Sequence, residues 1–344
     1  MSGSMTPAPE FSEPFCFPML LADIGGTNLR LAVLEGPQAQ PEFLPVRRCA
    51  DYDGLESAVS DILTDSSRPK VQSAMLALAG PVDGVTFRIT NSSWTIDPAA
   101  LRRAFDLREV MVVNDFEADA LALPGLAPED LQVIGDGQPV PDTARLILGP
   151  GTGLGAAGLV RTCCGWCPVA GEAGHMSLGP IGEEELALWP HIEVPDGRLS
   201  VENVLSGSGV MRLYRAFASL NGVDPVLETP EAVTAAADAG DELASQTLTR
   251  FAIILGRIAG DLALVYLARG GVYLAGGVVG SLERWLTSGA FRAAFEAKGP
   301  HRAIMSRIPT QIVKHPFPGL VGMAAFARTP SAFALDCDRR RWRA

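Results

Sequence analysis

Residues 19–34 read MLLADIGGTNLRLAVL. An apolar run leads into a turn that contains two glycines, and a second run leads out of it. In a familiar nucleotide-binding loop a helix would follow the glycines, whereas residues 29–34 largely alternate and are rich in residues that favour strands. The stretch therefore predicts a strand–turn–strand unit, and it raises the question of what the turn holds.

The chemistry of this turn suits a phosphate group. Gly25 and Gly26 would let backbone N–H groups approach a phosphate without obstruction by side chains. Thr27 and Asn28 add short hydrogen-bond donors, and Asp23 could orient Mg²⁺ directly or through water, because this ion prefers oxygen ligands and keeps much of its hydration. An ordinary hairpin turn is the competing interpretation of this motif taken alone.

A second turn of the same kind lies in residues 145–160, RLILGPGTGLGAAGLV. Four glycines occur in the seven residues 149–155, which is more than a plain hairpin requires. The two turns are about 125 residues apart and each is flanked by apolar runs. They suggest two related halves, each of which opens with a hairpin.

Two other nucleotide motifs are disfavoured by their context. Residues 153–158 match the dinucleotide pattern G-x-G-x-x-G, and Glu172 falls near the place of its ribose-binding carboxylate, but the segment that follows leaves no room for a helix. None of the three lysines ends a P-loop pattern (Lys70, Lys298 and Lys314). A bound nucleotide would therefore depend on backbone amides, hydroxyls and a metal ion.

Composition places the chain among globular proteins with a sizeable core. It has 344 residues, of which 47% are hydrophobic and 19% charged, and its net charge is −11. The acidic balance gives no overall attraction for nucleic acid or for an anionic membrane. The N-terminus shows no signal-peptide pattern, and the most apolar long segment, residues 251–267, contains Arg257 and Asp261. We expect a cytoplasmic protein with reduced cysteines.

Strands and helices alternate along the chain, which predicts the α/β class. Strands are expected at residues 73–79, 110–113 and 272–274, and helices at 117–123, 241–268 (one helix or two) and 320–327. Arg257 and Asp261 are spaced to meet on one helix face. Residues 126–144 are rich in Pro, Asp and Gly and predict a linker or a domain boundary.

Several polar residues beside glycines or at a strand end form a candidate site for a polyol. Asn114 and Asp115 follow a short buried strand, where ligands of open α/β sheets usually bind. The other members come later in the chain (Glu172, His175 and Glu202). A lone Asp at a strand end is more often structural, but the set as a whole resembles hydroxyl-binding groups. A polyol needs several donors and acceptors, because an unpaired buried hydroxyl is costly.

Two further features have a functional and a plain interpretation. Cys163, Cys164 and Cys167 could bind zinc, but no second C-x-x-C exists and the nearest histidine is His175, so a reduced hairpin is the favoured interpretation. The arginine-rich residues 339–343 are expected to be a solvated, frayed end.

Taken together, the motifs resemble the bacterial glucokinases, within the hexokinase–actin class of ATP-binding folds. LADIGGTNLRLAV is similar to the first phosphate motif of this family, LGPGTGLGAAGLV to its second, and VYLAGGVV to its adenosine-side motif. VVNDFEADALALP, GEAGHMSLGP and ENVLSGSGVMRLYRA are similar to its sugar-site segments. The resemblance runs in consistent order from about Leu20 to Ala327.

The resemblance implies an α/β chain with a two-domain actin-like ATPase (hexokinase/ribonuclease H-like) fold and an interdomain cleft. The small domain would comprise residues 17–125 and 317–335, and the large domain residues 126–316, with tails at 1–16 and 336–344. A homodimer is the oligomeric state that the resemblance suggests.

The resemblance also implies an activity, the ATP-dependent phosphorylation of glucose at its 6-hydroxyl, the first step of glycolysis. Asp115 would be the general base. The other sugar hydroxyls would be held by Asn114, Glu172, His175 and Glu202. The phosphates of ATP and Mg²⁺ would face Asp23, Gly25, Gly26, Thr27, Asn28, Gly151, Thr152 and Gly153, with Gly276 and Gly277 near the adenosine.

Alternatives stay open on the sequence alone. A kinase for fructose, mannose or an amino sugar would use the same motifs, because a reoriented hydroxyl can cost only one hydrogen bond. A non-catalytic sugar sensor would bind sugar without turnover, and an actin-like filament protein would have little use for the polar set. The repressor/kinase branch with a zinc site has its cysteines after the Gly-His segment, whereas here they precede it, and no segment before Leu20 is large enough for a helix-turn-helix.

Overall fold

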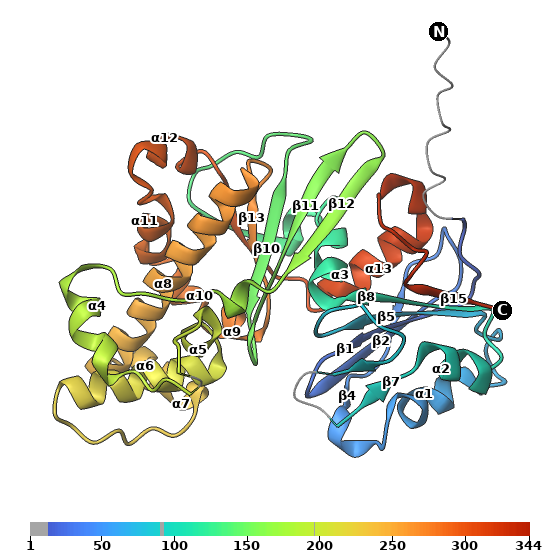
Figure 1. The fold of residues 1–344 in the computed structure, drawn as a ribbon, viewed down its shortest axis with the longest axis horizontal. Helices are drawn as coiled ribbons and strands as arrows, with labels where there is room; N and C mark the ends of the chain where they lie inside the picture. The colour runs from blue at the N-terminus through green and yellow to red at the C-terminus, as the bar shows by residue number, and fades with distance from the viewer. Residues whose placement is uncertain (1–12, 90–92, 196) are drawn as a thin grey trace, which may run out of the picture. The chain divides into compact units, whose positions relative to one another are not determined.

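The computed structural model of the chain describes residues 13–89, 93–195 and 197–344 (Figure 1). Its contacts divide the chain into two compact units, and each is described here by itself. The first unit contains the described residues up to Gly125, together with residues 160–168 and 317–344. The second contains residues 126–159 and 169–316. The sequence did not suggest that residues 160–168 belong with the first unit.

The first unit is built on a seven-stranded sheet in the order β15-β8-β5-β1-β2-β3, with β4 also paired to β2. The predicted hairpin is confirmed: β1 and β2 pair antiparallel from Met19↔Leu34 to Ile24↔Leu29. Strands β5 and β8 extend the sheet in parallel from β1. The strands of this sheet are β1 (Met19–Ile24), β2 (Asn28–Leu34), β3 (Glu42–Phe43), β4 (Arg47–Arg48), β5 (Ser73–Leu78), β8 (Glu109–Asn114) and β15 (Arg341–Arg343).

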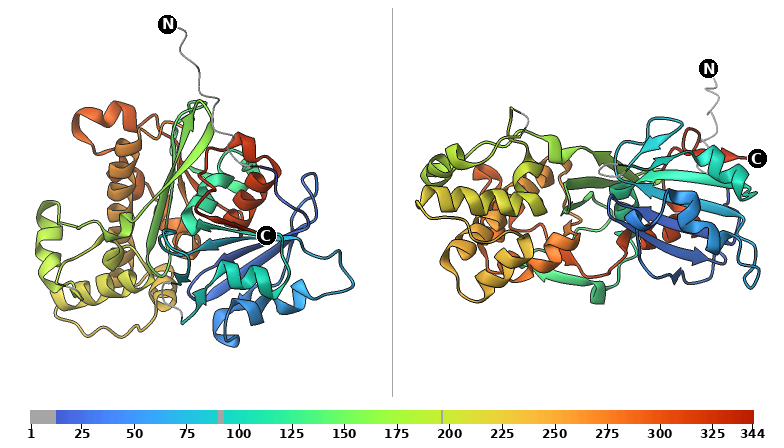
Figure 2. Two further views of the ribbon diagram at one scale, coloured as in Figure 1. Left: turned by 45° about the vertical axis from the view of Figure 1, so that its right-hand side comes forward. Right: turned by 90° about the horizontal axis from the view of Figure 1, so that it is seen from below.

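Both faces of this sheet are covered, which explains why its central strands are apolar at almost every position. Leu20 and Ala22 of β1 pack in the cluster that contains residues of α1 (Leu55–Leu63) and α2 (Pro98–Ala104). Met19 and Leu21 point to the other face, toward α3 (Asp115–Ala122) and α13 (Pro318–Arg328). Helices α3 and α13 lie side by side on that face in Figure 1 and in the left view of Figure 2.

The approach of α3 to α13 depends on a glycine. A Cβ added to Gly322 of α13 would overlap the carbonyl oxygen of Ala118 and would lie 2.7 Å from the backbone nitrogen of Ala122. Two helix backbones can come this close only where one of them carries no side chain. Because α3 begins at Asp115, this contact fixes the helix that carries the candidate base.

The second unit contains a six-stranded sheet in the order β12-β11-β10-β13-β14-β9, except that residues 160–168, where β11 and β12 adjoin, group with the first unit. It repeats the plan of the first sheet: β10 and β11 form an antiparallel hairpin, β13 and β14 extend it in parallel from β10, and an antiparallel edge strand completes it. The second expected hairpin is confirmed, but it does not open this half, because β9 precedes it in the chain. The strands are β9 (Leu131–Ile134), β10 (Arg145–Pro150), β11 (Leu154–Thr162), β12 (Gly165–Gly171), β13 (Val272–Leu274) and β14 (Thr310–Val313).

The linker interpretation of residues 126–144 is wrong for part of the segment. Residues 131–134 form β9, which pairs antiparallel with β14 from Leu131↔Val313 to Ile134↔Thr310. The strand is short, and its formation depends on a partner about 180 residues further along the chain, which local composition does not reveal.

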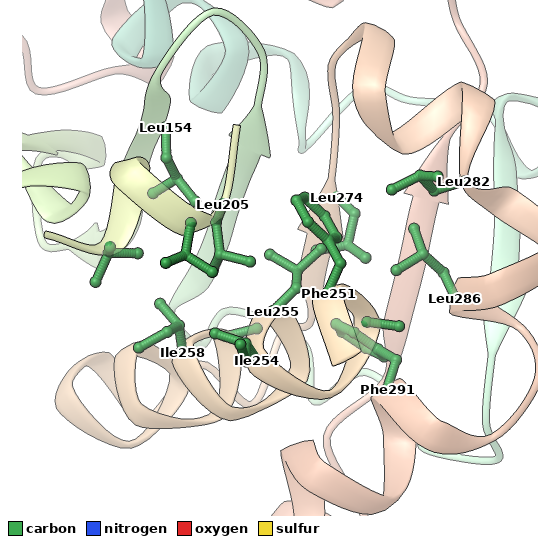
Figure 3. Packing of buried hydrophobic residues seen from close by; sticks show 14 of the residues in the cluster. Leu154, Leu205, Phe251, Ile254, Leu255, Ile258, Leu274, Leu282, Leu286 and Phe291 are labelled. Carbon is green, nitrogen blue, oxygen red and sulfur yellow. The ribbon is translucent and has the colours of Figure 1, made fainter. Parts of the chain in front are cut away.

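One long helix, α8 (Glu242–Tyr266), forms the centre of the second unit, which settles the choice between one helix and two. Asp241 caps its start by accepting the N–H of Ala244 at 2.8 Å, and Leu267 ends it in the left-handed conformation at φ 45°. Figure 3 shows how Phe251, Leu255 and Ile258 of this helix lie in a packed apolar layer. Their neighbours there include Leu154, Leu205, Leu274, Leu286 and Phe291.

The expected contact between Arg257 and Asp261 is wrong. Arg257 instead donates to the buried carboxylate of Glu185 at 2.7 Å, and Asp261 accepts from Lys298 at 2.6 Å. Both residues have partners on other elements, and these tertiary contacts override the helical spacing.

The remaining α-helices and strands are α4 (Gly182–Leu188), α5 (Val201–Val204), α6 (Gly207–Leu220), α7 (Pro230–Asp238), α9 (Gly277–Ser281), α10 (Glu283–Leu286), α11 (Ala290–Glu296), α12 (Arg302–Met305), β6 (Phe87–Arg88) and β7 (Thr95–Ile96).

The C-terminal segment is not a solvated tail, so that expectation is wrong. Strand β15 pairs antiparallel with β8, with Arg341 opposite Met111, and Trp342 meets Phe87 edge to face at 6.0 Å. Arg341 binds Glu109 at 2.6 Å. Of the expected N-terminal tail, residues 1–12 lie outside the described residues, and Cys16 donates its N–H to Glu109 at 2.8 Å.

The described part of the chain contains no helix that combines the length and the apolar character needed to span a bilayer.

Candidate functional site

The first unit gathers its candidate residues at one edge of its sheet. Parallel pairing places Ile24, Leu78 and Asn114 side by side at the carboxyl ends of β1, β5 and β8. The turn that begins at Gly25 and the side chain of Asp115 both follow this edge directly, which is where open α/β sheets bind ligands. The structure thus brings together two motifs that are about 90 residues apart in the sequence.

The glycine turn is stabilised by one hydrogen bond within the turn and by one from Cys49. The N–H of Gly25 donates to the carbonyl of Asn28 at 3.0 Å, and the carbonyl of Thr27 accepts the N–H of Cys49 at 2.9 Å. The thiol of Cys49 also lies 3.4 Å from the Gly25 carbonyl, and burial raises the pKa of this thiol. The Gly25 N–H is therefore already used within the turn.

Asn114 and Asp115 form the start of α3. The side-chain oxygen of Asn114 accepts the N–H groups of Phe116 and Glu117 at 3.0 and 3.1 Å, which is the contact that N-cap residues make. Its side-chain nitrogen donates to the Gly80 carbonyl at 3.0 Å and to Oδ1 of Asp115 at 2.9 Å. All four hydrogen-bonding positions of this amide are therefore used. One of these contacts holds the Asn114 amide against the Asp115 carboxylate.

A third carboxyl group, Asp119, stands one turn further along α3 and was missed in the sequence. Burial raises its pKa well above the ordinary value of 3.8, and the nearby charges of Asp23 and Asp115 raise it further, while Arg30 lowers it. Burial also raises the pKa of Asp23, against the effect of Arg30, whose Nη1 lies 3.0 Å from the Asp23 carboxylate. The spacing of four residues between Asp115 and Asp119 was the signal that could have identified this group.

This arrangement suits a divalent cation. Asp23 and Asp115 both lie within electrostatic reach of Asp119, and Arg30 acts on Asp23 and on Asp119. In the part of the chain that the structure describes, no three His, Cys, Asp or Glu side chains converge as a ready-made metal site. Mg²⁺ that arrives with a nucleotide is typically bound by one or two carboxylates, with phosphate and water completing the shell.

The raised pKa of Asp119 predicts a dependence of stability on pH. The folded chain holds a proton on this carboxyl that the unfolded chain releases above the ordinary pKa of 3.8, so the free energy of unfolding falls as pH rises from there toward the raised value. The side chain of the Asp119→Asn variant cannot release a proton, so its free energy of unfolding does not fall with pH for this reason. We expect its free energy of unfolding, relative to the unsubstituted chain, to increase as the pH rises above the ordinary pKa of 3.8. Urea denaturation at several pH values measures this difference, and a constant difference would contradict the assignment.

In the second unit, glycines follow the carboxyl ends of two neighbouring strands, β10 and β13. The turn Gly151–Gly153 follows β10, and the register Leu148↔Leu274 places it beside Gly276, which follows β13. Gly276 has φ 99°, a conformation that favours glycine, and an added Cβ would lie 3.0 Å from the Pro150 carbonyl. An added Cβ at Gly151 or Gly277 would meet no atom within 4 Å, so open space lies above the backbone there.

The second unit also brings together the three remaining candidate sugar ligands. Nδ1 of His175 lies 3.7 Å from Oε1 of Glu202, and the N–H of His175 donates to the Glu172 carbonyl at 3.0 Å. Oε2 of Glu202 lies 2.6 Å from the position of a Cβ at Gly153, so its carboxylate lies directly against the glycine turn. Glu172 and His175 are exposed, and the Glu202 side chain is 30% exposed. All three are accessible to a ligand.

The cysteine hairpin shows a close pair of thiols. The sulfur atoms of Cys163 and Cys164 are 3.5 Å apart at the turn between β11 and β12, and their contact raises the pKa of Cys164. Burial raises the pKa of Cys167, which is on β12. Among the described residues, these cysteines included, no three His, Cys, Asp or Glu side chains are grouped so that they could hold a metal ion.

Comparisons with known proteins agree on one family. The glucokinase family model matches residues 20–330. A glucokinase of Rhizobium meliloti is 46% identical over 97% of this chain and 99% of that protein. The crystal structure of a glucokinase from an Antarctic psychrotroph superposes with a TM-score of 0.81 at 32% identity, covering 92% of this chain and all of the other. A glucokinase of the ROK family from Streptomyces griseus, solved with glucose and AMPPNP, shares the fold at 20% identity with a TM-score of 0.61 and covers 90% of this chain and 99% of that one. The predicted fold class is confirmed.

Proposed function

The chain belongs to the glucokinase family and phosphorylates glucose with ATP, and from this premise we propose that Asp115 is the general base that accepts the proton of the sugar 6-hydroxyl. The observation that supports this role is the fixed position of Asp115 at the carboxyl edge of the sheet. Its Oδ1 accepts from Asn114 and from the N–H of Phe116, both at 2.9 Å. A carboxylate oriented in this way can accept a proton from a hydroxyl without first changing its rotamer.

Phosphoryl transfer depends mainly on positioning and on stabilising charge, and the two glycine turns supply both. We assign the phosphates of ATP to the N–H groups and hydroxyl of Gly26 and Thr27 in one turn, with Asn28 beside them. In the other turn they are assigned to residues 151–153, and Gly276 with Gly277 takes the adenosine side. The open space above Gly151 and Gly277 supports this assignment.

The carboxyl groups around Asp23 would hold Mg²⁺, directly or through water. When bound, this ion neutralises charge on the phosphates. Asp23 keeps its orientation through the contact with Arg30 at 3.0 Å. Asp119 holds a proton more readily than an ordinary carboxyl, and in its protonated form it adds a hydrogen-bond donor to this cluster.

Glucose would be held through its other hydroxyls by Glu172, His175 and Glu202. The carboxylates accept hydrogen bonds from hydroxyl groups, and the histidine ring both donates and accepts in its neutral form. The position of Glu202 against Gly153, with the His175 ring beside it, supports this role. In this scheme Asn114, which the sequence placed among the sugar ligands, orients Asp115 instead.

Two properties of the whole protein are also proposed. We place it in the cytoplasm, because its described cysteines are all free thiols, as is usual in a reducing compartment. We propose a homodimer as its oligomeric state, on the resemblance alone. Sedimentation at two protein concentrations tests the second proposal.

A hexose panel tests the substrate. The enzyme is incubated with MgATP and separately with glucose, fructose, mannose and glucosamine, and ADP formation is followed by a coupled assay. We expect kcat/KM to be highest for glucose, with the phosphate on its 6-hydroxyl. A higher value for another hexose would make the chain a kinase of that sugar. Binding of glucose in calorimetry without turnover of any hexose would identify a sugar sensor.

A further inference from the structure

We propose that Arg340, in the segment that leads into β15, is a positioning residue for the phosphoryl-transfer reaction, acting on Asp115 through Glu117 and Asn114. The inference rests on the proposed role of Asp115 as general base. It concerns a part of the chain that the sequence suggested would be a solvated end and that lies more than 220 residues from the site in sequence.

The chain of contacts begins at Glu117, whose side chain is buried with 5% of its surface exposed. Its Oε2 accepts the backbone N–H of Asn114 at 3.0 Å and Nη1 of Arg340 at 2.6 Å. Asn114 in turn donates from its side chain to Oδ1 of Asp115 at 2.9 Å. A continuous set of hydrogen bonds therefore connects Arg340 to the candidate base.

Glu117 is the third residue of α3 and forms a capping box with Asn114. In the usual capping box this carboxylate is at the surface and water stabilises its charge. Here the carboxylate is buried, and a buried charge without a partner is strongly unfavourable. Arg340 supplies that partner, and it thereby stabilises the capping box and the fixed backbone position of Asn114.

Arg340 itself is held in place by the sheet. Its carbonyl accepts the N–H of Val112 on β8 at 2.8 Å, and its neighbour Arg341 begins β15, which pairs with the same strand. The guanidinium of Arg341 is bound to the buried Glu109 at 2.6 Å and lies 4.1 Å from the ring centroid of Phe15. The C-terminal strand thus provides a rigid base from which Arg340 reaches the start of α3.

The test compares Arg340→Met with Arg339→Met. The control changes the adjacent residue, which is exposed, and removes the same charge from the same segment. We expect Arg340→Met to lower kcat by about tenfold, of the order that one charge-assisted hydrogen bond can control, with KM for ATP unchanged within about twofold. Arg339→Met should keep the kcat of the unsubstituted enzyme, and Arg340→Lys, which can still donate to Glu117, should recover most of it.

Two backgrounds separate positioning from a general loss of structure. In Asp115→Asn, the Arg340→Met change should lower the residual turnover no further, because the group that it positions is already absent. In Glu117→Gln, which keeps an acceptor for the Asn114 N–H but loses the charge, it should also have no further effect. Full additivity in both backgrounds would overturn the proposal, as would equal kcat for Arg340→Met and Arg339→Met.

The outcomes also distinguish this inference from the proposed function. If Asp115→Asn keeps most of its turnover, the assignment of the base fails, whatever Arg340 does. If Asp115→Asn is inactive and Arg340→Met matches its control, only the positioning role fails. If Arg340→Met does not fold, the test uses Glu117→Gln alone. We expect this variant to have a lower kcat and an unchanged KM for ATP. An unchanged kcat would overturn the proposal that this chain of hydrogen bonds positions Asp115.

Discussion

The Asp115→Asn variant is expected to lose about 10²–10⁴-fold in kcat, the range typical of a positioned general base, while it still binds ATP. Asparagine has nearly the same shape as aspartate, and its side-chain oxygen can still accept from Asn114 and from the Phe116 N–H, as Oδ1 does now. The start of α3 should therefore keep its geometry. What the variant loses is the ability to take up the proton of the sugar hydroxyl.

A matched control exists on another helix of the same unit. Asp97 caps α2 by accepting the Ala100 N–H at 2.9 Å, and asparagine caps helices equally well. Asp97→Asn should therefore have normal kcat and normal stability. ATP affinity is measured for both variants by calorimetry. If Asp115→Asn keeps more than about a tenth of the unsubstituted kcat, far above the range for loss of a general base, Asp115 is not the base.

The Gly322→Ala variant is expected to have the largest effect on stability. The new methyl group would overlap the Ala118 carbonyl oxygen and crowd the Ala122 nitrogen, so α3 and α13 must move apart. Overpacking typically costs about 1–3 kcal/mol and occasionally more, and backbone atoms cannot give way as a flexible side chain can. We expect Tm to fall by about 5–10 °C and, because α3 carries Asp115 at its start, kcat to fall as well.

Gly280→Ala is the control for this change. Gly280 lies in α9, where an added Cβ would meet no atom within 4 Å, and alanine favours helices over glycine by about 0.5–1 kcal/mol. Its Tm should be unchanged or slightly raised. Both midpoints come from thermal denaturation followed by circular dichroism. An unchanged Tm for Gly322→Ala would mean that the two helices do not pack as closely as described.

Local patterns were enough to predict the two hairpins, the strands β5, β8 and β13, and the helices α3, α8 and α13. The alternation after Asn28 identified β2, the apolar run after Val110 identified β8, and residues 241–268 identified α8. These patterns are strong because each reflects burial of one face or of both faces of an element. The two glycine turns could be assigned to hairpins because strand-forming residues flank them on both sides.

Elements that depend on distant partners could not be predicted. The arginine-rich segment that contains β15 has the composition of a solvated end. In the structure its arginines bind the buried carboxylates of Glu109 and Glu117, and these partners cannot be identified from the local sequence. β9 forms because it can pair with β14. Arg257 and Asp261 have the spacing of a helical pair, and each instead binds a partner from another element.

The N-D motif and the residues Glu172, His175 and Glu202 were proposed from residue type and neighbouring glycines, and their roles stay predictions. The saturation of the Asn114 amide by protein partners was beyond sequence reasoning, because it depends on Gly80 and on the geometry of the cap. Asp119 was missed because an acidic residue on a helix is usually solvated, and its burial follows from the packing around α3.

The central claim, that Asp115 takes part in the transfer step itself, is tested most directly by rapid-quench single-turnover measurements with both substrates saturating. Such measurements separate the chemical step from substrate binding and product release. For Asp115→Asn, we predict a rate constant of phosphoryl transfer at least about 100-fold below that of the unsubstituted enzyme and of Asp97→Asn. A transfer rate within tenfold of the unsubstituted enzyme would contradict the account, because the proton would then leave the hydroxyl without this carboxylate.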